Sequence, residues 1–271
     1  MTDEEFRRIY IFLKNKYGID MSRKKEIVKG RLDNYVSNMG FQSYMDYMNS
    51  VESDVTGKLE SELVDMLTSN HPFFMREEVH FDYLKNVVLP YWKKKLELKK
   101  DICIWCGASS TGEEPYVLAM VVSDFFGLEQ KSWDTTILAT DVSTAALSTA
   151  VAGMYTTEQV SKIPDTWKRR YMKNKMGTDI YEMSEDIKRQ VLFRQFNLMS
   201  PFPFRKKMHI IFLRNVMIYF NAEDKTNLLK KIYDLLEPGG YLFIGKTETI
   251  ERDKVPFELI HPSIFRKPER G

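Results

Sequence analysis

Residues 103–116 constrain the fold of this 271-residue chain more than any other stretch. An apolar run ends at Cys106, a loop lies between Gly107 and Gly112, and a helix-forming segment begins at Glu113. Open α/β sheets bind nucleotide-like ligands at such a turn, where a strand gives way to a helix N-terminus. The sequence therefore predicts an α/β sheet with a ligand site at this loop.

The two glutamates that follow the loop restrict the kind of ligand. A phosphate-binding loop needs Lys and then Ser or Thr after its second glycine, but Glu113 and Glu114 stand there. Both are anionic at neutral pH, so they would repel a di- or triphosphate and suit a ligand with a cationic end. S-adenosylmethionine has such an end, an α-ammonium near a sulfonium, and its carboxylate suits the helix N-terminus. We expect it to be the cofactor.

From about residue 100, apolar strands alternate with helices. Strands are expected at 102–105, 136–140, 208–213 and 241–244, helices at 114–126, 143–151 and 222–236, and a closing strand within 257–265. This alternation predicts a doubly wound, mostly parallel sheet. Residues 155–196 interrupt the pattern with two helical segments and a hairpin-like pair, 180–183 and 191–196. We expect a small inserted α+β subdomain there.

Residues 1–75 are expected to form a separate N-terminal helical domain, followed by the sheet domain over 76–271. Thr2 and Glu5 form a capping box at the start of the first helix. The second helix is basic and carries Arg23, Lys24, Lys25, Lys29 and Arg31. Such a face could dock on an acidic partner, and an ordinary solvated helix face accounts for it equally well.

Composition argues against several classes of function. The chain has 40 Lys and Arg against 38 Asp and Glu, and a net charge of +2 does not favour nucleic acid as a partner. There is no run of 18 apolar residues and no signal-peptide core, so we expect a cytoplasmic protein without membrane insertion. Neither a metal site nor a redox pair is expected, because the four histidines are scattered and Cys103 and Cys106 fall on opposite faces of a strand.

Polar residues at strand ends are the candidate ligand groups. Asp141 ends the second strand, where an acid can accept hydrogen bonds from ribose hydroxyls, although it could instead cap the next helix. Arg214 and Asn215 follow a later buried strand, at the edge of the sheet where ligands bind. Tyr219 comes shortly after them and suits either packing or chemistry.

Taken together, these motifs resemble the CheR family of chemoreceptor glutamate methyltransferases over essentially the whole chain. The resemblance rests on Ser110-Thr111-Gly112-Glu113-Glu114-Pro115-Tyr116, Ala139-Thr140-Asp141, the run from Arg214 to Phe220, and Pro238-Gly239-Gly240-Tyr241-Leu242-Phe243. Leu67, Thr68 and Asn70, followed by Phe73, Phe74, Arg76 and Glu77, add to it. It implies an N-terminal helical domain and a Rossmann-like class I methyltransferase domain with a small inserted subdomain.

The resemblance also implies which residues carry the chemistry. It places cofactor contacts at Asn70, Arg76, Glu114, Asp141, Asn197, Leu198, Asn215 and Val216. It assigns to Tyr219 the catalytic task of positioning the reacting groups. The chain departs from the family's pattern at Pro72, where Thr or Ser is usual, and at Phe73, where some members carry Arg. The short loop near Glu185 resembles the branch that works without a receptor pentapeptide.

The implied reaction is methyl transfer from S-adenosylmethionine to glutamate side chains of methyl-accepting chemoreceptors, which yields γ-methyl esters and S-adenosylhomocysteine. A glutamate carboxylate has a pKa of roughly 4.3, so it is already a nucleophile at neutral pH and needs no general base. The implied partner is the cytoplasmic helical bundle of a receptor, and the sequence is compatible with a monomer.

Three other functions compete with this one. A methyltransferase acting on RNA is disfavoured by the nearly balanced charge. A non-catalytic module that senses S-adenosylmethionine and binds a receptor or scaffold stays open because of Pro72 and Phe73. An NAD dehydrogenase is least favoured, since the loop from Gly107 to Gly112 lacks the middle glycine of the dinucleotide motif.

Overall fold

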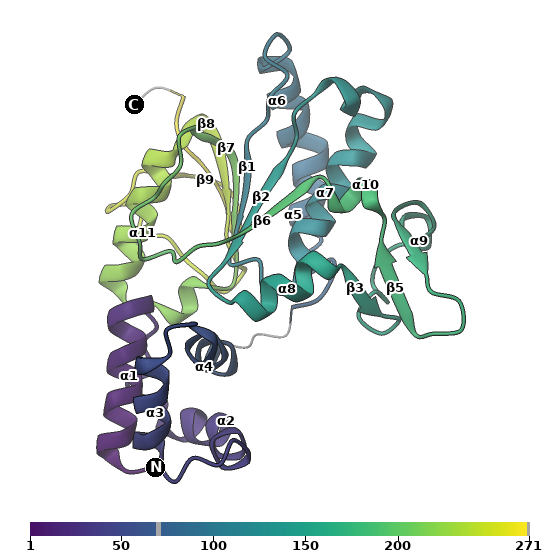
Figure 1. The fold of residues 1–271 in the computed structure, drawn as a ribbon. Helices are drawn as coiled ribbons and strands as arrows, with labels where there is room; N and C mark the ends of the chain where they lie inside the picture. The colour runs from purple at the N-terminus through teal and green to yellow at the C-terminus, as the bar shows by residue number, and fades with distance from the viewer. Residues whose placement is uncertain (69–71, 270–271) are drawn as a thin grey trace.

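The computed structural model describes residues 1–68 and 72–269. Its centre is an open sheet whose strands lie in the order β6-β2-β1-β7-β8-β10-β9 (Figure 1). Strands β6, β2, β1, β7 and β8 pair in parallel, whereas β10 runs antiparallel between β8 and β9. The bounds are Ile104–Gly107 for β1, Ile137–Asp141 for β2, Val191–Gln195 for β6, Met208–Leu213 for β7, Leu236–Phe243 for β8, Glu258–His261 for β9 and Ile264–Arg266 for β10. The predicted doubly wound, mostly parallel sheet is confirmed.

Neighbouring side chains of the central strand β1 enter two different cores, because successive residues of a strand point to opposite faces. Cys106 packs in the core that also holds residues of α5 and α7, and Trp105 packs on the other face with residues of α11. Cys103 contacts that second core, so the two cysteines lie on opposite faces of the sheet, as predicted. Both are free thiols. The covering helices are α5 (Val79–Tyr83), α6 (Leu89–Lys95), α7 (Glu113–Phe126) and α11 (Ala222–Leu235).

The strand order reverses at β1, since β2 lies on one side of it and β7 on the other. At such a switch point the connections leave in opposite directions and open a crevice outside the carboxyl ends of the strands. The glycine-bounded loop follows β1 directly and enters α7. The topology therefore places the ligand site where the loop motif predicts it.

Four helices at the N-terminus enclose a core of their own, below the sheet domain in Figure 1. They are α1 (Asp3–Tyr17), α2 (Lys25–Asn38), α3 (Tyr44–Ser53) and α4 (Lys58–Thr68), and the capping box at Thr2 is present. Helix α4 packs on α8 (Thr144–Ala152), and Ile19 forms an isolated β-bridge with Phe220. The boundary predicted near residue 75 falls in the segment between α4 and α5.

The insertion differs from its prediction. A small antiparallel sheet has the order β3-β5-β4, with β3 at Met154–Thr156, β4 at Met172–Asn174 and β5 at Ile180–Met183. The predicted hairpin between 180–183 and 191–196 is wrong, because β6 pairs in parallel with β2 at the edge of the main sheet. Helix α10 (Glu185–Lys188) separates the two strands, and Phe193 of β6 packs on Tyr116 of α7. Strand periodicity predicts a buried face but not the partner strand.

Two smaller expectations also change. Residues 157–163 form turns, so α9 (Asp165–Tyr171) follows them without a preceding helix, and the predicted closing strand is two strands, β9 and β10.

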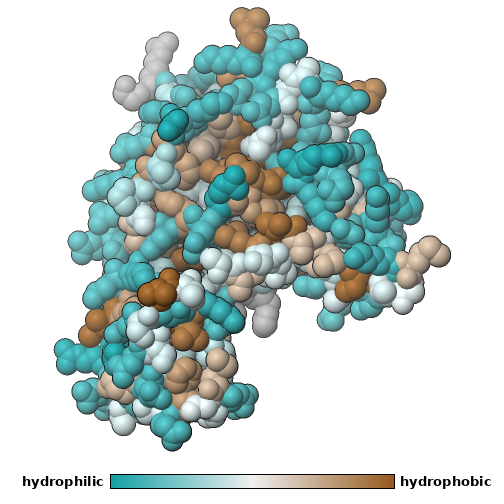
Figure 2. Space-filling view, in the orientation of Figure 1, coloured by the Kyte–Doolittle hydropathy of each residue, from teal (hydrophilic) through white to brown (hydrophobic). Residues whose placement is uncertain are grey.

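In the view of Figure 2 the surface is hydrophilic over most of its area, and hydrophobic residues gather across the middle of the sheet domain. Within the described ranges, no helix is both long enough and apolar enough to span a membrane.

Candidate functional site

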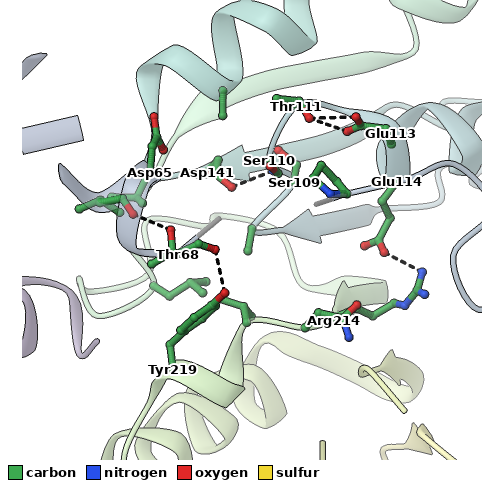
Figure 3. Close-up of a pocket in the computed structure, with 18 of the residues that line it drawn as sticks. Asp65, Thr68, Ser109, Ser110, Thr111, Glu113, Glu114, Asp141, Arg214 and Tyr219 are labelled. Atoms are coloured by element: carbon green, nitrogen blue, oxygen red, sulfur yellow. Dashed lines mark hydrogen bonds and ion pairs between the residues drawn. The ribbon is translucent and has the colours of Figure 1, made fainter. Parts of the chain in front are cut away.

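A cavity of about 460 Å³ lies at the carboxyl ends of β1, β2 and β7 and is closed on one side by α4 (Figure 3). Eight described residues chosen from the sequence line it, namely Arg76, Glu114, Asp141, Asn197, Leu198, Asn215, Val216 and Tyr219. Asn70, the remaining candidate, lies outside the described residues. Segments that are far apart in the sequence are thus brought to one site.

The loop after β1 is held in an unusual backbone conformation by Asp141. Ala108 and Ser110 have φ values of 56° and 48°, a region that non-glycine residues rarely adopt. One carboxylate oxygen of Asp141 accepts the backbone N–H of Ser110 at 2.8 Å, and the other accepts that of Ser143 at 2.9 Å. Burial raises the pKa of Asp141, and these N–H donors oppose that shift. Because Ser143 is the N-cap of α8, Asp141 is not the cap.

Gly112 ends the loop, and no other residue fits there without strain. Its φ is 98°, and a Cβ at this position would lie 2.8 Å from the Cβ of Ala150 and 2.9 Å from the hydroxyl of Tyr155. Helix α7 therefore begins close against α8, and its first turn points toward the cavity. The glycine allows the backbone to come this close.

The two neighbouring glutamates have different surroundings. Glu113 is buried, and the hydroxyl of Thr111 donates to its two oxygens at 2.9 and 2.7 Å. Burial raises the pKa of Glu113 and the Thr111 hydrogen bond lowers it, with burial the larger effect. Glu114 instead lies 2.7 Å from a guanidinium nitrogen of Arg214 (Figure 3). The thiol of Cys106 donates to its other oxygen at 3.2 Å.

Arg214 is buried between two carboxylates. Its guanidinium also contacts Glu77 at 3.3 Å and donates to the backbone carbonyl of Arg76. Burial opposes ionisation of Glu77, but Arg214 and the backbone N–H of Lys246 together hold the pKa of this carboxyl below its ordinary value. Of the two carboxylates, Glu114 lines the cavity, where it can accept a cation such as an α-ammonium.

Glu248 organises the turn after β7, a role that the sequence reasoning missed. This buried carboxylate accepts the backbone N–H groups of Asn215 at 2.9 Å, Met217 at 2.7 Å and Gly245 at 2.6 Å. It thereby stabilises Asn215 at a φ of 59° and directs the following turn past the cavity. The sequence feature that could have indicated this role is the acidic residue three positions after Gly245.

Tyr219 lies on the cavity wall that faces the helical domain. Its hydroxyl donates to the backbone carbonyl of Thr68 at 2.7 Å, and burial raises its pKa, so the phenol stays protonated at neutral pH. The ammonium of Lys24 lies 5.8 Å from the centre of its ring. Tyr219 therefore connects the start of α2 and the end of α4 to the site.

Asn197 and Leu198 form the adjoining wall. The side-chain amide of Asn197 donates to the carbonyl of Lys16 at 2.7 Å, and its oxygen accepts the N–H of Met199 at 2.9 Å. Leu198 is buried, and its carbonyl accepts a hydrogen bond from Lys231 at 2.8 Å. The side chain of Asn197 thus ties the end of α1 to the cavity.

The segment after α4 carries the two departures from the expected pattern. Phe73 is 41 % exposed at the cavity, with the guanidinium of Arg76 at 5.6 Å and the ammonium of Lys162 at 4.1 Å from its ring centre. Pro72 also lines the cavity and has no hydroxyl to offer a ligand. Phe73 therefore lies close to two cations beside the site.

Two residues of α4, Asp65 and Thr68, line the cavity although the sequence reasoning gave neither a role in the site. Both stand on a helix whose apolar face packs in the N-terminal core. A polar residue on such a helix ordinarily faces solvent, so its position carried no signal. Only the packing of α4 against α8 places these side chains at the ligand site.

Two family models together match nearly the whole chain. The model of the CheR all-alpha domain matches residues 4–68, and that of the CheR SAM binding domain matches residues 70–265. The chain belongs to the CheR methyltransferase family. It is an S-adenosylmethionine-dependent methyltransferase with an α/β methyltransferase fold and an N-terminal all-helical domain.

Curated relatives match over similar lengths. The chemotaxis protein methyltransferase of Borreliella burgdorferi is 36% identical over 272 residues, covering 98% of this chain and 95% of the relative. Chemotaxis protein methyltransferase 1 of Pseudomonas aeruginosa is 32% identical, covering 97% of this chain and 96% of the relative. Chemotaxis protein methyltransferase 1 of Vibrio cholerae is 31% identical, with 98% of both chains covered.

The residues present fit S-adenosylmethionine. Glu114 offers a carboxylate to the α-ammonium, and Asp141 offers carboxylate oxygens at the end of β2. Apolar side chains that can accept an adenine, including Val142, Phe196 and Leu198, line the same cavity. The chain therefore provides suitable partners for the ammonium, the ribose and the adenine of the cofactor.

We expect replacement of Glu248 by alanine to lower the free energy of unfolding by about 3 kcal/mol or more, because three backbone N–H groups lose a charged acceptor. Urea unfolding followed by circular dichroism measures the loss. Glu258→Ala, at an exposed position of β9, is the control and should change stability by less than about 0.5 kcal/mol. A loss of less than 1 kcal/mol at Glu248 would contradict the assigned role.

Proposed function

We propose that this enzyme transfers the methyl group of S-adenosylmethionine to glutamate side chains of methyl-accepting chemoreceptors, forming glutamyl γ-methyl esters and S-adenosylhomocysteine. The observation that carries the proposal is the match, over nearly the full length of both chains, with relatives named chemotaxis protein methyltransferases. The proposed site of action is the cytoplasm, where the helical bundle of a receptor presents its glutamates.

The geometry of the site supports a direct displacement. Bound S-adenosylmethionine supplies an electrophilic methyl group. The receptor carboxylate is ionised at neutral pH, so its oxygen attacks the methyl carbon while the electron pair of the broken carbon–sulfur bond stays on sulfur. No proton has to be removed, and catalysis consists of aligning the three atoms and excluding water. In this mechanism Glu114 holds the α-ammonium and Asp141 holds the ribose.

Tyr219 is the proposed catalytic residue, and it acts by positioning. Its protonated phenol is held at the cavity wall by the Thr68 carbonyl, next to the segment that carries Arg76. We assign Arg76, Asn197, Leu198, Asn215 and Val216 to the cofactor pocket, together with Asn70 on the basis of the family pattern. These side chains would enclose the cofactor, because all of the described ones line the same cavity.

The basic helix α2 is the proposed docking surface for the receptor. Lys24 at its start reaches the ring of Tyr219, so the helix borders the site. Arg23 lies in the turn just before α2, although the sequence predicted it in the helix, and it is exposed, as is Lys29. Arg31 bonds to the carbonyl of Leu67, and Lys25 pairs with Asp3. An acidic receptor bundle would be attracted to the exposed cations.

The central test is transfer of labelled methyl from S-adenosylmethionine to a chemoreceptor cytoplasmic fragment, followed by mild alkali. Label that appears on the receptor and leaves as methanol establishes a carboxyl methyl ester. Alkali-stable label rejects glutamate as the acceptor, and transfer to RNA instead of protein would identify the competing methyltransferase class. Intact cofactor binding without transfer to any of several receptors would favour the sensing-module alternative.

The two glutamates at the start of α7 can be separated by matched substitutions. Glu114→Gln should raise the dissociation constant of S-adenosylmethionine about tenfold or more, because it removes the carboxylate that faces the α-ammonium. Glu113→Gln should leave that constant within a few-fold, since Thr111 already bonds both of its oxygens. Isothermal titration calorimetry measures both values, and an equal loss in the two variants contradicts the assignment.

Removing exposed charge from α2 should slow the encounter with the receptor. The double variant Arg23→Gln/Lys29→Gln is expected to show a several-fold lower kcat/KM for the receptor at low ionic strength, and a flatter dependence on salt. Lys99→Gln/Lys131→Gln removes the same charge at exposed positions of the sheet domain and should behave like the wild type. Parallel salt curves for both double variants would reject α2 as the docking surface.

A further inference from the structure

Asp65 on α4 has no role in the mechanism described above, yet it lines the cofactor cavity (Figure 3). One of its carboxylate oxygens accepts the hydroxyl of Ser143 at 2.7 Å. The backbone N–H of the same serine donates to Asp141 at 2.9 Å. A single serine thus joins one carboxylate from the helical domain and one from the sheet domain on the same cavity wall.

The position of Asp65 is set by the contact between α4 and α8. Ser143 is the N-cap of α8 and accepts the N–H of Ala146 at 2.9 Å, while the N–H of Thr144 donates to the hydroxyl of Ser61 on α4 at 3.1 Å. These bonds anchor the start of α8 to α4 at two consecutive residues. Asp65 is therefore held beside Asp141 and is not a surface side chain that happens to point inward.

Asp65 is ionised at neutral pH although its surroundings disfavour the charged form. Burial is the main cause that raises its pKa to about 6; the hydrogen bond from Ser143 lowers it, and the negative charges of Asp141 and Glu62 raise it further. The charged groups that face Asp65 from neighbouring elements are thus mainly carboxylates. The nearby cation Arg31 of α2 donates its hydrogen bonds to main-chain carbonyls, including that of Leu67. Arg76, Glu113 and Glu114 also line the cavity.

The raised pKa of Asp65 makes the stability of the fold depend on pH. A carboxyl group whose pKa is higher in the folded than in the unfolded state stabilises the fold at pH values below its unfolded-state pKa of 3.8. That contribution is lost as the pH rises through about 6. At pH 7 the ionised Asp65 therefore weakens the ligand-free fold. A residue that costs stability at the physiological pH is a candidate for a role in function.

We propose that Asp65 is a further cofactor-binding residue, whose carboxylate accepts a hydrogen bond from a ribose hydroxyl of S-adenosylmethionine beside Asp141. The ribose carries two neighbouring hydroxyl donors, and the two carboxylates that share Ser143 offer matching acceptors. The cofactor thereby contacts both domains at once, and its binding strengthens the interface between α4 and α8. The proposal rests on cofactor binding and not on the identity of the methyl acceptor.

Protonation of Asp65 should then weaken cofactor binding. The ionised form is the hydrogen-bond acceptor, so affinity is full above about pH 6 and falls as the pH drops below that value. The α-ammonium of the cofactor keeps its charge in this range, since α-amino groups ordinarily have a pKa of roughly 7.7–8.0. The affinity loss between pH 7 and pH 5 therefore reports on carboxyl groups of the enzyme.

The test compares wild-type enzyme with Asp65→Asn, using S-adenosylhomocysteine as the ligand in isothermal titration calorimetry at pH 7 and pH 5. Asparagine keeps an oxygen for Ser143 but cannot ionise. The variant should bind about tenfold more weakly at pH 7, with little change between the two pH values, whereas the wild type should lose affinity at pH 5. Glu26→Gln, an exposed acid on α2, is the control and should match the wild type.

Thermal unfolding of the ligand-free proteins separates this role from a structural one. Asp65→Asn should melt at the same or a higher temperature than the wild type at pH 7, because it removes a poorly solvated charge. Unchanged affinity in Asp65→Asn, or a wild-type pH dependence retained by it, overturns the proposal. Either result leaves the methyl-ester assay untouched, since ligand binding is measured without a receptor.

Discussion

The buried guanidinium of Arg214 is the interaction on which the cofactor site depends. It lies at the end of β7 and joins Glu114 at the start of α7 to Glu77 and the carbonyl of Arg76 in the segment before α5. A buried charge without its partners is costly, commonly 3–5 kcal/mol when one member of a pair is removed, so these three segments must assemble together. The same guanidinium holds the Glu114 carboxylate at the cavity, where it suits the α-ammonium of S-adenosylmethionine.

Two other carboxylates shape the site through the main chain. Asp141 accepts N–H groups from two neighbouring loops, from Ser110 after β1 and from Ser143 before α8. Glu248 does the same for the turn after β7 by accepting three N–H groups. Backbone in the left-handed region persists only where surrounding structure compensates its cost, and these acids supply that compensation. Loops that would otherwise be flexible are thus held in a shape suited to a ligand.

The helical domain is part of the site and more than a neighbour to it. Thr68 and Asp65 of α4 contribute to the cavity wall, and Tyr219 of the sheet domain donates to α4 across the boundary. The basic helix α2 begins beside the same tyrosine. The cofactor cavity and the proposed docking surface therefore share one interface, which offers a physical basis for coupling between them.

The sequence by itself determined the strand, loop and helix around Gly112, the alternating elements of the sheet, and the acidic pair from which the cofactor was predicted. These features depend on neighbouring residues, so local propensity and periodicity are sufficient to predict them. Only the tertiary structure decided that β6 joins β2, that Arg214 pairs with Glu114, and that Asp65 meets Ser143. Each of these contacts joins residues far apart in the chain, and both their partners and their pKa values are set by burial that no local pattern encodes.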